Sequence, residues 1–535
     1  MSMATYPIAA GDYERAGAAT GGLKAMLKKV GVDAAALRRA MIAAYEAEMN
    51  VVIHSLGGEM RVMLEDGMLD VEVADEGPGI PDVELAMKEG YSTAPAKARQ
   101  LGFGAGLGLP NIRKNSDRFH IESQVGAGTR VRFAILFSPQ EALGRAICSV
   151  RAVAELCREC LRCLPACPTG AVRVRRGRPE VLEHLCVNCG SCIAACEWGA
   201  LTVKEEGSLP RAGAAPLIVP AALLVQFGPA AGPRRALAEL AALGFEEIWV
   251  TIGWHDALSD AVAACASEEG RVRPVISPVC PAVVSLVEMR FPSLIEYLAP
   301  FASPVEAAWR DAAGRDAVAV VGCPAEHSVL TAPRGHRSAE AVAPHKLVQA
   351  ILRRIAEGGE GGEDTRSLLC EAPKGPWTAK DSWCLFPPDG VLRASGMRHV
   401  VAVLEAAEDG RLGDVPRLEL HACEGGCFGS PLLREDPFVA RWRWEQRGGE
   451  VPRRAGRAVR REQPFAARRG LRLAEDMGAA IARLAEIDRL VRTLPGRDCG
   501  LCGAPTCAAL AEDIVLGRAE RTACPHATAG EERPT

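Results

Sequence analysis

The sequence lacks the features that mark exported, membrane-spanning and nucleic-acid-binding proteins. Its first residues, MSMATYPIAAGDYERAG, contain neither the basic stretch nor the apolar stretch of a signal peptide. The longest apolar run, residues 216–225, has about half the length that a membrane-spanning helix needs. The formal net charge is −4, so no basic field favours nucleic acid. We therefore expect a cytoplasmic protein without a membrane or nucleic-acid partner.

Aromatic residues are also scarce, at 5%, but the remaining composition is that of a folded protein. Hydrophobic residues make up 48% and charged residues 24%, which excludes a wholly disordered chain. At roughly 150 residues per domain, a chain of 535 residues is expected to hold three or four domains. We expect a multidomain chain of α/β and α+β folds.

Cysteine is the exception, with 20 residues that gather in groups. They are too few for a disulfide scaffold, and in a chain without an export signal grouped cysteines favour metal binding. Residues 1–138 contain none, residues 148–206 contain nine, residues 214–445 contain seven and residues 491–528 contain four. We expect four domains with these bounds, and a basic linker followed by an amphipathic helix over residues 446–490.

Two hairpins and two glycine-rich stretches give residues 1–138 the pattern of a nucleotide-binding domain. Residues 60–73 and 119–135 each alternate apolar and polar side chains around a turn. Between them lie DEGPG (75–79) and GFGAGLGL (102–109), whose glycines let the backbone approach a phosphate closely, although a flexible linker is the alternative. Glu46 and Asn50 are four residues apart and share one helix face, where one can act as a base and the other hold Mg²⁺.

The order of these motifs, with Gly128-Thr129 after them, resembles the GHKL ATPases, and most closely their anti-sigma factor and serine kinase branch. The stretch GYSTAPAKARQLGFGAGLGLPNIRKNSDRFHIESQVGAGT is the closest part, and the likeness covers nearly all of residues 1–138. It implies a GHKL (Bergerat) α/β sandwich that binds ATP and Mg²⁺. No helical hairpin with a phosphoacceptor histidine precedes this domain, which argues against a histidine kinase.

The resemblance also implies a role for each motif residue. Glu46 is the catalytic residue that activates the attacking hydroxyl or water, and Asp75 binds the adenine amino group. Without the resemblance, Asp75 could be a plain turn residue and Glu46 a solvated helix charge. Asn50 ligates Mg²⁺, Thr129 lies close to Asp75, and the glycines from Gly102 to Gly108 form a lid over the phosphates. The implied ATP and Mg²⁺ site is Asn50, Asp75, Gly77, Gly79, Gly102, Gly104, Gly106, Gly108 and Thr129.

Residues 148–206 contain two consecutive runs of four cysteines. The first run reads C-x2-C-x2-C-x3-C-P, and the second has the same spacing but ends before Glu197 instead of proline. This is the run of bacterial ferredoxins with two 4Fe-4S clusters, in which the fourth cysteine of each run ligates the other cluster. Zinc is the alternative. The expected ligand sets are Cys157, Cys160, Cys163 and Cys196 for one cluster, and Cys186, Cys189, Cys192 and Cys167 for the other.

The last four cysteines follow the segment LPGRD. Their spacing is C-x2-C-x4-C-x16-C, which resembles the small domain that holds a single 4Fe-4S cluster and begins with such a Leu-Pro-Gly segment. Zinc is again the alternative. The expected ligands are Cys499, Cys502, Cys507 and Cys524.

The middle of the chain has cysteines in SPVCP (277–281), VGCPAE (321–326) and ELHACEGGC (419–427). Each stands beside or near proline or glycine, and each alone could be a buried thiol. Together they resemble the active-site domain of iron-only hydrogenases, a hydrogenase-like α/β domain, over roughly residues 270–435. The resemblance implies that Cys280, Cys323, Cys423 and Cys427 hold a 4Fe-4S cluster. In a true hydrogenase, Cys427 would also bridge to a di-iron unit.

Three positions depart from the catalytic hydrogenases. Val279 stands where these enzymes have a proton-carrying cysteine, and Glu326 stands where a lysine pairs with the di-iron cyanide. A glutamate would repel an anionic ligand. After Cys427 the chain reads FGSP instead of a glycine run. We do not expect fast hydrogen turnover, and a di-iron unit remains open. Ordinary core or surface thiols are the default for Cys148, Cys265, Cys370 and Cys384, although Cys384 could lie near this site.

Residues 453–472 contain eight arginines and precede an apolar pattern, from Met477 to Leu494, spaced three or four apart as on one helix face. We interpret the arginine stretch as a solvated linker. The alternative is that it screens anionic clusters or binds an acidic partner.

The arrangement favours an iron–sulfur redox regulator, with a response to hydrogen as one option, whose ATP-binding domain acts as a serine kinase or an anti-sigma-type output. Its expected cofactors are three to four 4Fe-4S clusters, ATP and Mg²⁺. Its expected partners are a redox donor and a regulator or anti-sigma antagonist, and a homodimer is one option. The alternative is an iron-only hydrogenase or related electron-transfer oxidoreductase with an ATPase appendage. A third hypothesis couples ATP hydrolysis to low-potential electron transfer.

Overall fold

The computed structural model describes residues 2–65, 67–95, 98–99, 103–139, 147–204, 213, 215–229, 231–313, 315–331, 340–357, 390–451 and 454–527. The chain divides into two compact units. Unit 1 consists of Met1–Leu143, Arg469–Asp498 and Thr506–Thr535, and unit 2 consists of Gly144–Arg468 and Cys499–Pro505. No helix within the described ranges combines the length and the hydropathy needed to cross a membrane.

Unit 1 is built on an antiparallel sheet of five strands in the order β1-β2-β3-β5-β4. The two predicted hairpins are present as β2–β3 and β5–β4. Alternation decides which side chains are buried, since Met60 and Val62 on β2 face the core while Arg61 and Met63 are exposed. The strands are β1 (Ser2–Ile8), β2 (Gly58–Glu65), β3 (Met68–Asp75), β4 (Arg118–Gln124) and β5 (Gly128–Leu136).

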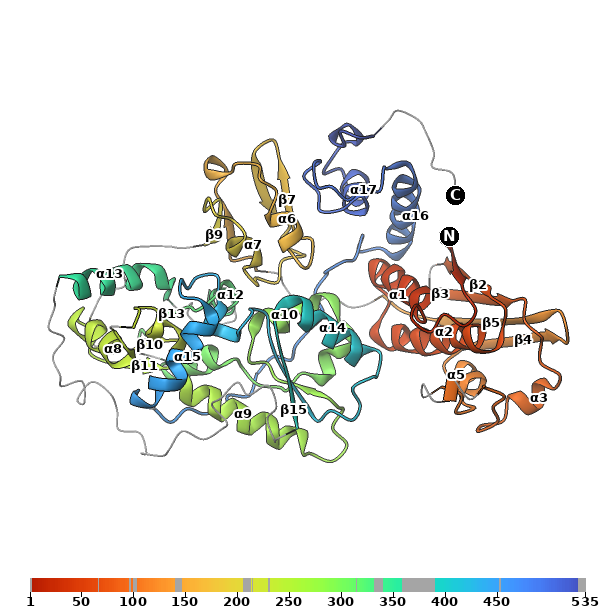
Figure 1. Cartoon of the computed structure of the whole chain (residues 1–535), viewed down its shortest axis with the longest axis horizontal. Helices are drawn as coiled ribbons and strands as arrows, with labels where there is room; N and C mark the ends of the chain where they lie inside the picture. Colours follow the sequence, from red (N-terminus) through yellow and green to blue (C-terminus); the bar gives the residue numbers. More distant parts are fainter. Residues whose placement is uncertain are drawn as a thin grey trace. The chain divides into compact units, whose positions relative to one another are not determined.

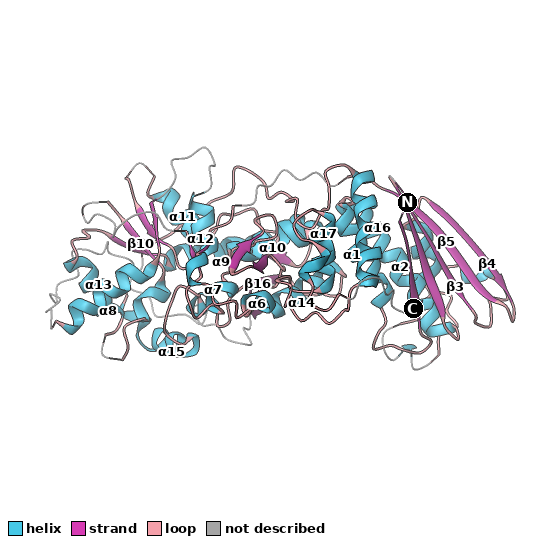
Figure 2. Ribbon diagram, turned by 90° about the horizontal axis from the view of Figure 1, so that it is seen from above, coloured by secondary structure: helices cyan, strands magenta, loops and turns pink. Residues whose placement is uncertain are grey.

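Helices cover one face of this sheet, and Figure 2 shows α2 alongside strands β3 to β5. The long helix α2 begins where the Asp33 side chain accepts a hydrogen bond from the Ala36 amide at 2.9 Å. The helices of unit 1 are α1 (Ala18–Val30), α2 (Ala34–His54), α3 (Val83–Ala86), α5 (Gly108–Lys114), α16 (Met477–Thr493), α17 (Cys507–Val515) and the short 3-10 helix η7 (Arg521–Ala523).

The amphipathic helix predicted before the last cysteine group is α16, and it is part of unit 1. It packs against α1, α17 and the strands β1 and β2. The Asp476 side chain caps its first turn by accepting from the Ala479 amide at 2.7 Å. Met477, Ile481, Leu484 and Ile487 form its buried face, as their spacing predicts.

Unit 2 begins with two small antiparallel sheets, β6–β9 and β7–β8, which alternate with single-turn helices. The two halves repeat the same arrangement of a cysteine loop followed by a short helix, as expected for a ferredoxin fold. The elements are β6 (Val150–Ala152), η1 (Ala154–Leu156), α6 (Cys163–Ala166), β7 (Val172–Arg175), β8 (Arg178–Val181), α7 (Ser191–Ala194) and β9 (Leu201–Val203).

The rest of unit 2 contains two parallel sheets of the α/β type, with strand orders β11-β10-β13-β14 and β12-β16-β15. Helices separate the strands, as Figure 1 shows for α8, α9 and α13. The strands are β10 (Leu217–Val219), β11 (Ile248–Val250), β12 (Val275–Ile276), β13 (Val318–Val320), β14 (Glu340–Val342), β15 (Val391–Ser395) and β16 (Arg417–His421). The helices are η2 (Ala221–Val225), α8 (Pro233–Ala242), α9 (Ile252–Ala266), α10 (Pro281–Arg290), η3 (Pro292–Tyr297), α11 (Pro304–Asp311), α12 (Pro324–Thr331), α13 (Pro344–Ala356), α14 (Met397–Glu408), η5 (Gly426–Gly429), α15 (Pro437–Arg447) and η6 (Gly448–Glu450).

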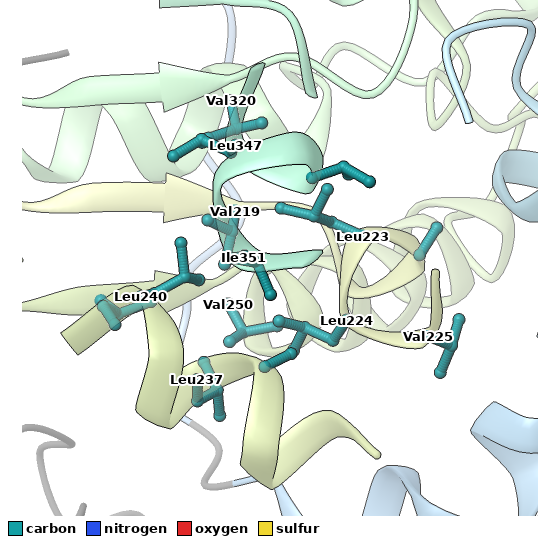
Figure 3. Close-up of a cluster of buried hydrophobic side chains, with 14 of the residues drawn as sticks. Val219, Leu223, Leu224, Val225, Leu237, Leu240, Val250, Val320, Leu347 and Ile351 are labelled. Atoms are coloured by element: carbon teal, nitrogen blue, oxygen red, sulfur yellow. The ribbon is translucent and has the colours of Figure 1, made fainter. Parts of the chain in front are cut away.

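The four-stranded sheet is buried on both faces, which is why its strands are continuously apolar. On one face Val219, Val250 and Val320 pack against α8 and α13 (Figure 3). On the other face Ile218 and Trp249 pack with the residues of α11. The sheet is therefore a rigid support for the loops that follow its strands.

The interpretation of the arginine stretch as a solvated linker is wrong for Arg454, Arg461 and Arg468, which pack within unit 2, whereas Arg457 and Arg460 are exposed. The guanidinium carbon of Arg454 lies 4.0 Å from the centre of the Trp249 ring. Main-chain hydrogen bonds join Ala302 to Val459 at 2.8 Å and Arg461 to Pro300 at 3.0 Å. A Cβ atom at Gly253 would lie 1.9 Å from the Arg454 carbonyl oxygen, so only glycine permits this contact.

The packing of α16 predicts that Leu484→Ala destabilises unit 1. Leu484 is 3% exposed, and removal of its side chain should lower the free energy of unfolding by about 2–5 kcal/mol. Glu486→Ala on the exposed side of the same helix is the control and should cost less than about 1 kcal/mol. Denaturant unfolding of the full chain checks both variants. Equal losses would contradict the docking of α16.

Candidate functional sites

The predicted catalytic residue and magnesium ligand share one face of α2, next to the start of α5. Glu46 Oε1 accepts a hydrogen bond from Asn111 Nδ2 at 2.7 Å. A Cβ atom at Gly108 would lie 3.1 Å from Asn50 Oδ1 and 3.3 Å from Glu46 Oε2. The structure thus brings Glu46, Asn50 and Gly108 together. Asn111 was missed in the sequence, although it follows Gly108 by three residues and so lies on the same face of α5.

The predicted adenine-binding residue lies at the end of β3. Asp75 Oδ1 accepts hydrogen bonds from Ser55 Oγ at 2.9 Å and from the Gly77 amide at 2.7 Å. A Cβ atom at Gly77 would lie 2.8 Å from the same carboxylate oxygen, which explains the glycine. Ser55 is a second residue that the sequence did not reveal. These hydrogen bonds fix the orientation of the Asp75 carboxylate.

The loop after Asp75 packs against the turn between β4 and β5. Gly79 has φ 72°, and a Cβ atom there would lie 2.2 Å from the Gln124 carbonyl oxygen. Gly128 has φ 90°, and its Cβ would lie 2.0 Å from the Asp75 carbonyl oxygen. This close approach places Thr129 beside the Asp75 loop, and the Thr129 hydroxyl is 2.8 Å from Ser123 Oγ.

Two of the predicted lid glycines have left-handed backbone conformations. Gly104 has φ 88° and Gly106 has φ 74°. A Cβ atom at Gly106 would lie 2.5 Å from the Gly90 carbonyl carbon, and the Gly106 carbonyl oxygen accepts from the Gly90 amide at 3.0 Å. Gly102 lies outside the described residues, as do the spare thiols Cys370 and Cys384.

Glu48, a buried carboxylate two residues after Glu46, has a structural role. Glu48 accepts hydrogen bonds from the amides of Gly17, Ala19 and Thr20 at 2.9–3.2 Å, and from the Thr20 hydroxyl at 2.7 Å. These amides form the beginning of α1, where a negative charge offsets the helix dipole. Glu48 therefore holds α1 against α2.

In unit 2 the thiols of the first expected ferredoxin set face one another. Burial, together with the nearby thiols of Cys196, Cys160 and Cys157, raises the pKa of Cys163 to about 11. The same four cysteines line one cavity, together with apolar side chains such as Val174 and Trp198.

The second set also draws a cysteine from the other run. Burial raises the pKa of Cys189, and the Cys167 thiol adds to the shift. The backbone around the two sets repeats: Glu159 and Leu161 have φ 52° and 60°, and the equivalent Asn188 and Gly190 have φ 56° and 75°. Such turns point amides toward the enclosed thiols, as the Asn188 amide shows by its 3.4 Å contact with Cys186 Sγ.

The third set surrounds a cavity of about 190 Å³ in the hydrogenase-like region. Cys280 precedes α10, Cys323 precedes α12, Cys423 follows β16, and Cys427 lies in η5. All four line the cavity, and burial is the main cause that raises each thiol's pKa.

The three thiol sets of unit 2 follow one another in space. Besides burial, the nearby thiols that raise the pKa of Cys192 include Cys163 of the first set. Likewise the Cys189 thiol of the second set is among the causes that raise the pKa of Cys423 in the third. Gly190 approaches the same region, since a Cβ atom there would lie 2.4 Å from Pro431. The second set therefore lies between the other two.

Val279 and Glu326, two of the three departures from the catalytic hydrogenases, line this cavity. Val279 contributes an apolar wall. Glu326 is turned back to its own loop, where its Oε2 accepts from the Gly322 amide at 2.5 Å. Burial raises the pKa of Glu326 to about 7, against the opposing effect of that amide. Its carboxyl group therefore holds a proton for much of the time near neutral pH.

The polar side chains that line the cavity together with the cysteines were not visible in the sequence. His421 Nε2 lies 3.4 Å from Glu419 Oε1, and Arg393 Nε donates to Glu419 Oε2 at 3.3 Å. Burial opposes ionisation of Glu419, but His421 and Arg393 together lower its pKa to about 2. Burial lowers the pKa of His255 to about 4, so this second imidazole is neutral. Cys427 Sγ lies 3.9 Å from His421 Nδ1.

The last four cysteines divide between the units. In unit 2, Cys499 and Cys502 lie in a loop whose Gly503 carbonyl oxygen accepts from the Val174 amide at 2.9 Å. In unit 1, Cys507 begins α17 and its amide donates to Asp498 Oδ1 at 2.6 Å, while Cys524 follows η7.

The thiol sets of unit 2 fit iron–sulfur clusters. Raised pKa values mean that the thiols stay protonated when nothing offsets their burial and mutual repulsion. The positive irons of a cluster supply that offset and stabilise the thiolates. No three His, Cys, Asp or Glu side chains in the described part of the chain converge closely enough to hold a single metal ion. A cubane instead takes each thiolate on a different iron, around an enclosed volume.

Comparison with known proteins identifies the N-terminal segment. Residues 36–139 match the family described as histidine kinase-, DNA gyrase B-, and HSP90-like ATPase. The anti-sigma F factor of Clostridium acetobutylicum is 33% identical over 104 residues, which are 18% of this chain and 69% of that protein. The chain belongs to the GHKL ATPases of the anti-sigma factor and serine kinase branch. Its remaining domains come from iron–sulfur protein families.

Other members of this branch are also similar to the GHKL segment. The anti-sigma F factor of Geobacillus stearothermophilus is 34% identical over 92 residues, 16% of this chain, and the chain spans about 60% of that protein's length. Serine/threonine-protein kinase RsbT of Bacillus subtilis is 28% identical over 109 residues, covering 20% of this chain and 76% of the kinase.

The cysteine-rich regions match three further families. Residues 156–201 match a 4Fe-4S dicluster domain, residues 216–311 the C-terminal domain of the iron only hydrogenase large subunit, and residues 494–526 an Fe-S cluster family. All four resemblances seen in the sequence are thereby confirmed. A variant of [FeFe]-hydrogenase HydA1 from Chlamydomonas reinhardtii is 15% identical with a TM-score of 0.32, over 45% of this chain and 86% of that one.

The close approach at Gly128 predicts that Gly128→Ala weakens ATP binding to the GHKL domain. Alanine at a left-handed position costs about 1–2 kcal/mol, and here its Cβ would also push the Asp75 loop away. Gly126→Ala is the matched control, because Gly126 has φ 79° but nothing lies within 4 Å of its Cβ position. Equilibrium dialysis with ATP and Mg²⁺ should show weaker binding for the first variant alone. Equal affinities would contradict the assigned geometry.

Proposed function

We propose that this chain is an iron–sulfur redox regulator whose ATP-binding domain acts on a protein partner, by phosphorylating a serine or by sequestering a regulator. One observation carries the proposal. The same chain contains a GHKL site in which Glu46 and Asn50 lie together, and three thiol sets that follow one another in space as an electron relay requires. The relay ends in a cavity that has Val279 and Glu326 in place of the proton-carrying cysteine and the lysine. Such a site is suited to register electrons or a small ligand, including hydrogen, better than to turn hydrogen over.

The geometry of α2 and α5 supports the proposed phosphoryl step. Glu46, oriented by Asn111, accepts the proton of a serine hydroxyl as that oxygen bonds to the γ-phosphorus and the bond to the β-phosphate oxygen breaks. ADP leaves, and the phosphate stays on the serine. Asn50 is the side chain placed to hold Mg²⁺, which neutralises phosphate charge when bound. Asp75, fixed by Ser55 and the Gly77 amide, accepts from the adenine amino group.

The clusters supply the redox signal. We propose the same cysteine ligands for them as the sequence suggests. In unit 2 the three sets are Cys157, Cys160, Cys163 and Cys196; Cys186, Cys189, Cys192 and Cys167; and Cys280, Cys323, Cys423 and Cys427. We propose Cys499, Cys502, Cys507 and Cys524 as a fourth set. Reduction changes ATP chemistry only if one state of the GHKL domain is stabilised more by reduced than by oxidised clusters.

The proposal predicts that ATP turnover depends on the redox state of the clusters. Anaerobic full-length protein should hydrolyse or transfer the ATP γ-phosphate at different rates when oxidised and when reduced by dithionite. Glu46→Gln should lower both rates about 100-fold or more, with ATP still bound, because the proton acceptor is lost. Glu84→Gln, an exposed carboxylate on α3, is the control. Equal oxidised and reduced rates in the wild type would refute the redox input.

An iron-only hydrogenase activity is the second candidate, favoured by the polar side chains of Glu419, His421 and Arg393 that line the cavity of the third thiol set. Iron content separates the candidates: about 16 irons per chain correspond to four cubanes, and about 18 to an additional di-iron unit. We expect about 16 irons and no infrared bands of iron-bound CO or cyanide. Such bands together with H₂-dependent dye reduction would establish the second candidate instead.

A further inference from the structure

One arginine of the basic stretch is buried inside unit 2. Arg468 is 6% exposed, and its Nη2 donates to the carbonyl oxygens of Cys186 at 2.9 Å and Glu183 at 3.4 Å. Its main-chain amide donates to the Glu288 carbonyl oxygen at 2.9 Å. Within the described residues its buried Nε has no hydrogen-bond acceptor. Burial of a guanidinium that keeps an unused donor is costly unless negative charge lies nearby.

The charges around Arg468 come from a carboxylate and from thiols. Burial lowers the pKa of Arg468, while Glu288, Cys186 and Cys148 oppose that shift. Cys186 belongs to the second ferredoxin set, and Cys148 is a buried spare thiol beside it, whose hydrogen bond is the main cause that raises the pKa of Cys186. A cubane held by four thiolates is anionic and gains one more negative charge on reduction. Arg468 therefore faces the place where that charge appears.

The main chain around Arg468 is held at both ends. On one side, the Ala466 amide donates to Glu288 Oε1 at 3.4 Å, and Glu288 lies on α10, the helix that begins directly after Cys280. On the other side the chain enters unit 1, where the Leu473 amide donates to the Lys29 carbonyl oxygen at 3.0 Å. Arg472 also packs there, with its Cδ 2.7 Å from the Cβ position of Gly31. The connecting segment, residues 469–476, joins these attachments and leads into α16.

We propose that Arg468 stabilises the reduced form of the cluster bound through Cys186, and that this charge in turn holds the start of the connecting segment in place. The inference rests on the proposed function, because it presupposes a cluster at the second set and an output in unit 1. Coupling of this kind is reciprocal. If the docked position of Arg468 stabilises the reduced cluster, reduction of the cluster stabilises that position of Arg468 by the same free energy. Arg468 acts here as a positioning and potential-setting residue, without contact to ATP.

The test is an anaerobic potentiometric titration of the full chain, followed by EPR. Arg468→Met should make one cubane harder to reduce by roughly tenfold, about 59 mV for one electron, with unchanged iron content. Arg469→Met, at the exposed next position, should leave all midpoint potentials as in the wild type. Arg468→Lys keeps the positive charge but loses the branched guanidinium group, so the midpoint potential of this cubane should stay close to that of the wild type.

Each result decides one point. Midpoint potentials in Arg468→Met that equal those of the wild type would overturn the inference. So would a shift in Arg468→Lys as large as that in Arg468→Met, because the positive charge would then not be the cause. If Arg468→Met loses iron, Arg468→Lys still decides the question. A lysine variant that retains its iron but has a lowered midpoint potential would also contradict a charge effect. ATP turnover is measured on the same samples. If ATP turnover of the wild type does not depend on redox state, the proposed function alone is refuted. If Arg468→Met has a shifted midpoint potential but its ATP turnover responds to redox state as in the wild type, the link to the connecting segment is refuted.

Discussion

The burial of many cysteines in enclosed space, where ionised thiolates would also repel one another, is the constraint on which unit 2 depends. The cysteines of three sets face one another in enclosed space, and burial raises the pKa of Cys163, Cys189 and Cys280 alike. The loops that bring them there contain left-handed residues such as Glu159 and Asn188, each of which costs about 1 kcal/mol or more. Iron–sulfur clusters bound at these sets would offset both costs, and their binding would then be coupled to the folding of this unit.

Much of the fold and of the sites was predictable because it rests on local patterns. Alternation along residues 60–73 specified the first hairpin, and spacing three or four apart specified α16. Cysteine spacing predicted the crossed grouping in which Cys167 meets Cys189, because loop length limits which thiols can surround one cluster. The family comparisons confirm these domains, whereas the individual ligand and ATP-site roles stay proposals.

The features that were missed depend on contacts between distant segments. Asn111 holds Glu46, and Ser55 holds Asp75, through hydrogen bonds that no local pattern reveals. The docking of Arg454 on Trp249 was also missed, because a run of arginines looks solvated in a sequence. An arginine side chain can lie on an aromatic face while its guanidinium keeps polar partners. This property turns the expected linker into a packed segment that ends at the buried Arg468.

The proposed redox regulation requires an energetic coupling between the clusters and the ATP site. The most direct test is to measure the midpoint potentials of the clusters in the full chain by EPR, with and without saturating ATP and Mg²⁺. Coupling of binding free energies is reciprocal, so if reduction alters the affinity for ATP then ATP must shift at least one midpoint potential. We expect such a shift in the wild type, and we expect it to disappear in a variant that does not bind ATP. Identical potentials with and without ATP in the wild type would contradict this coupling.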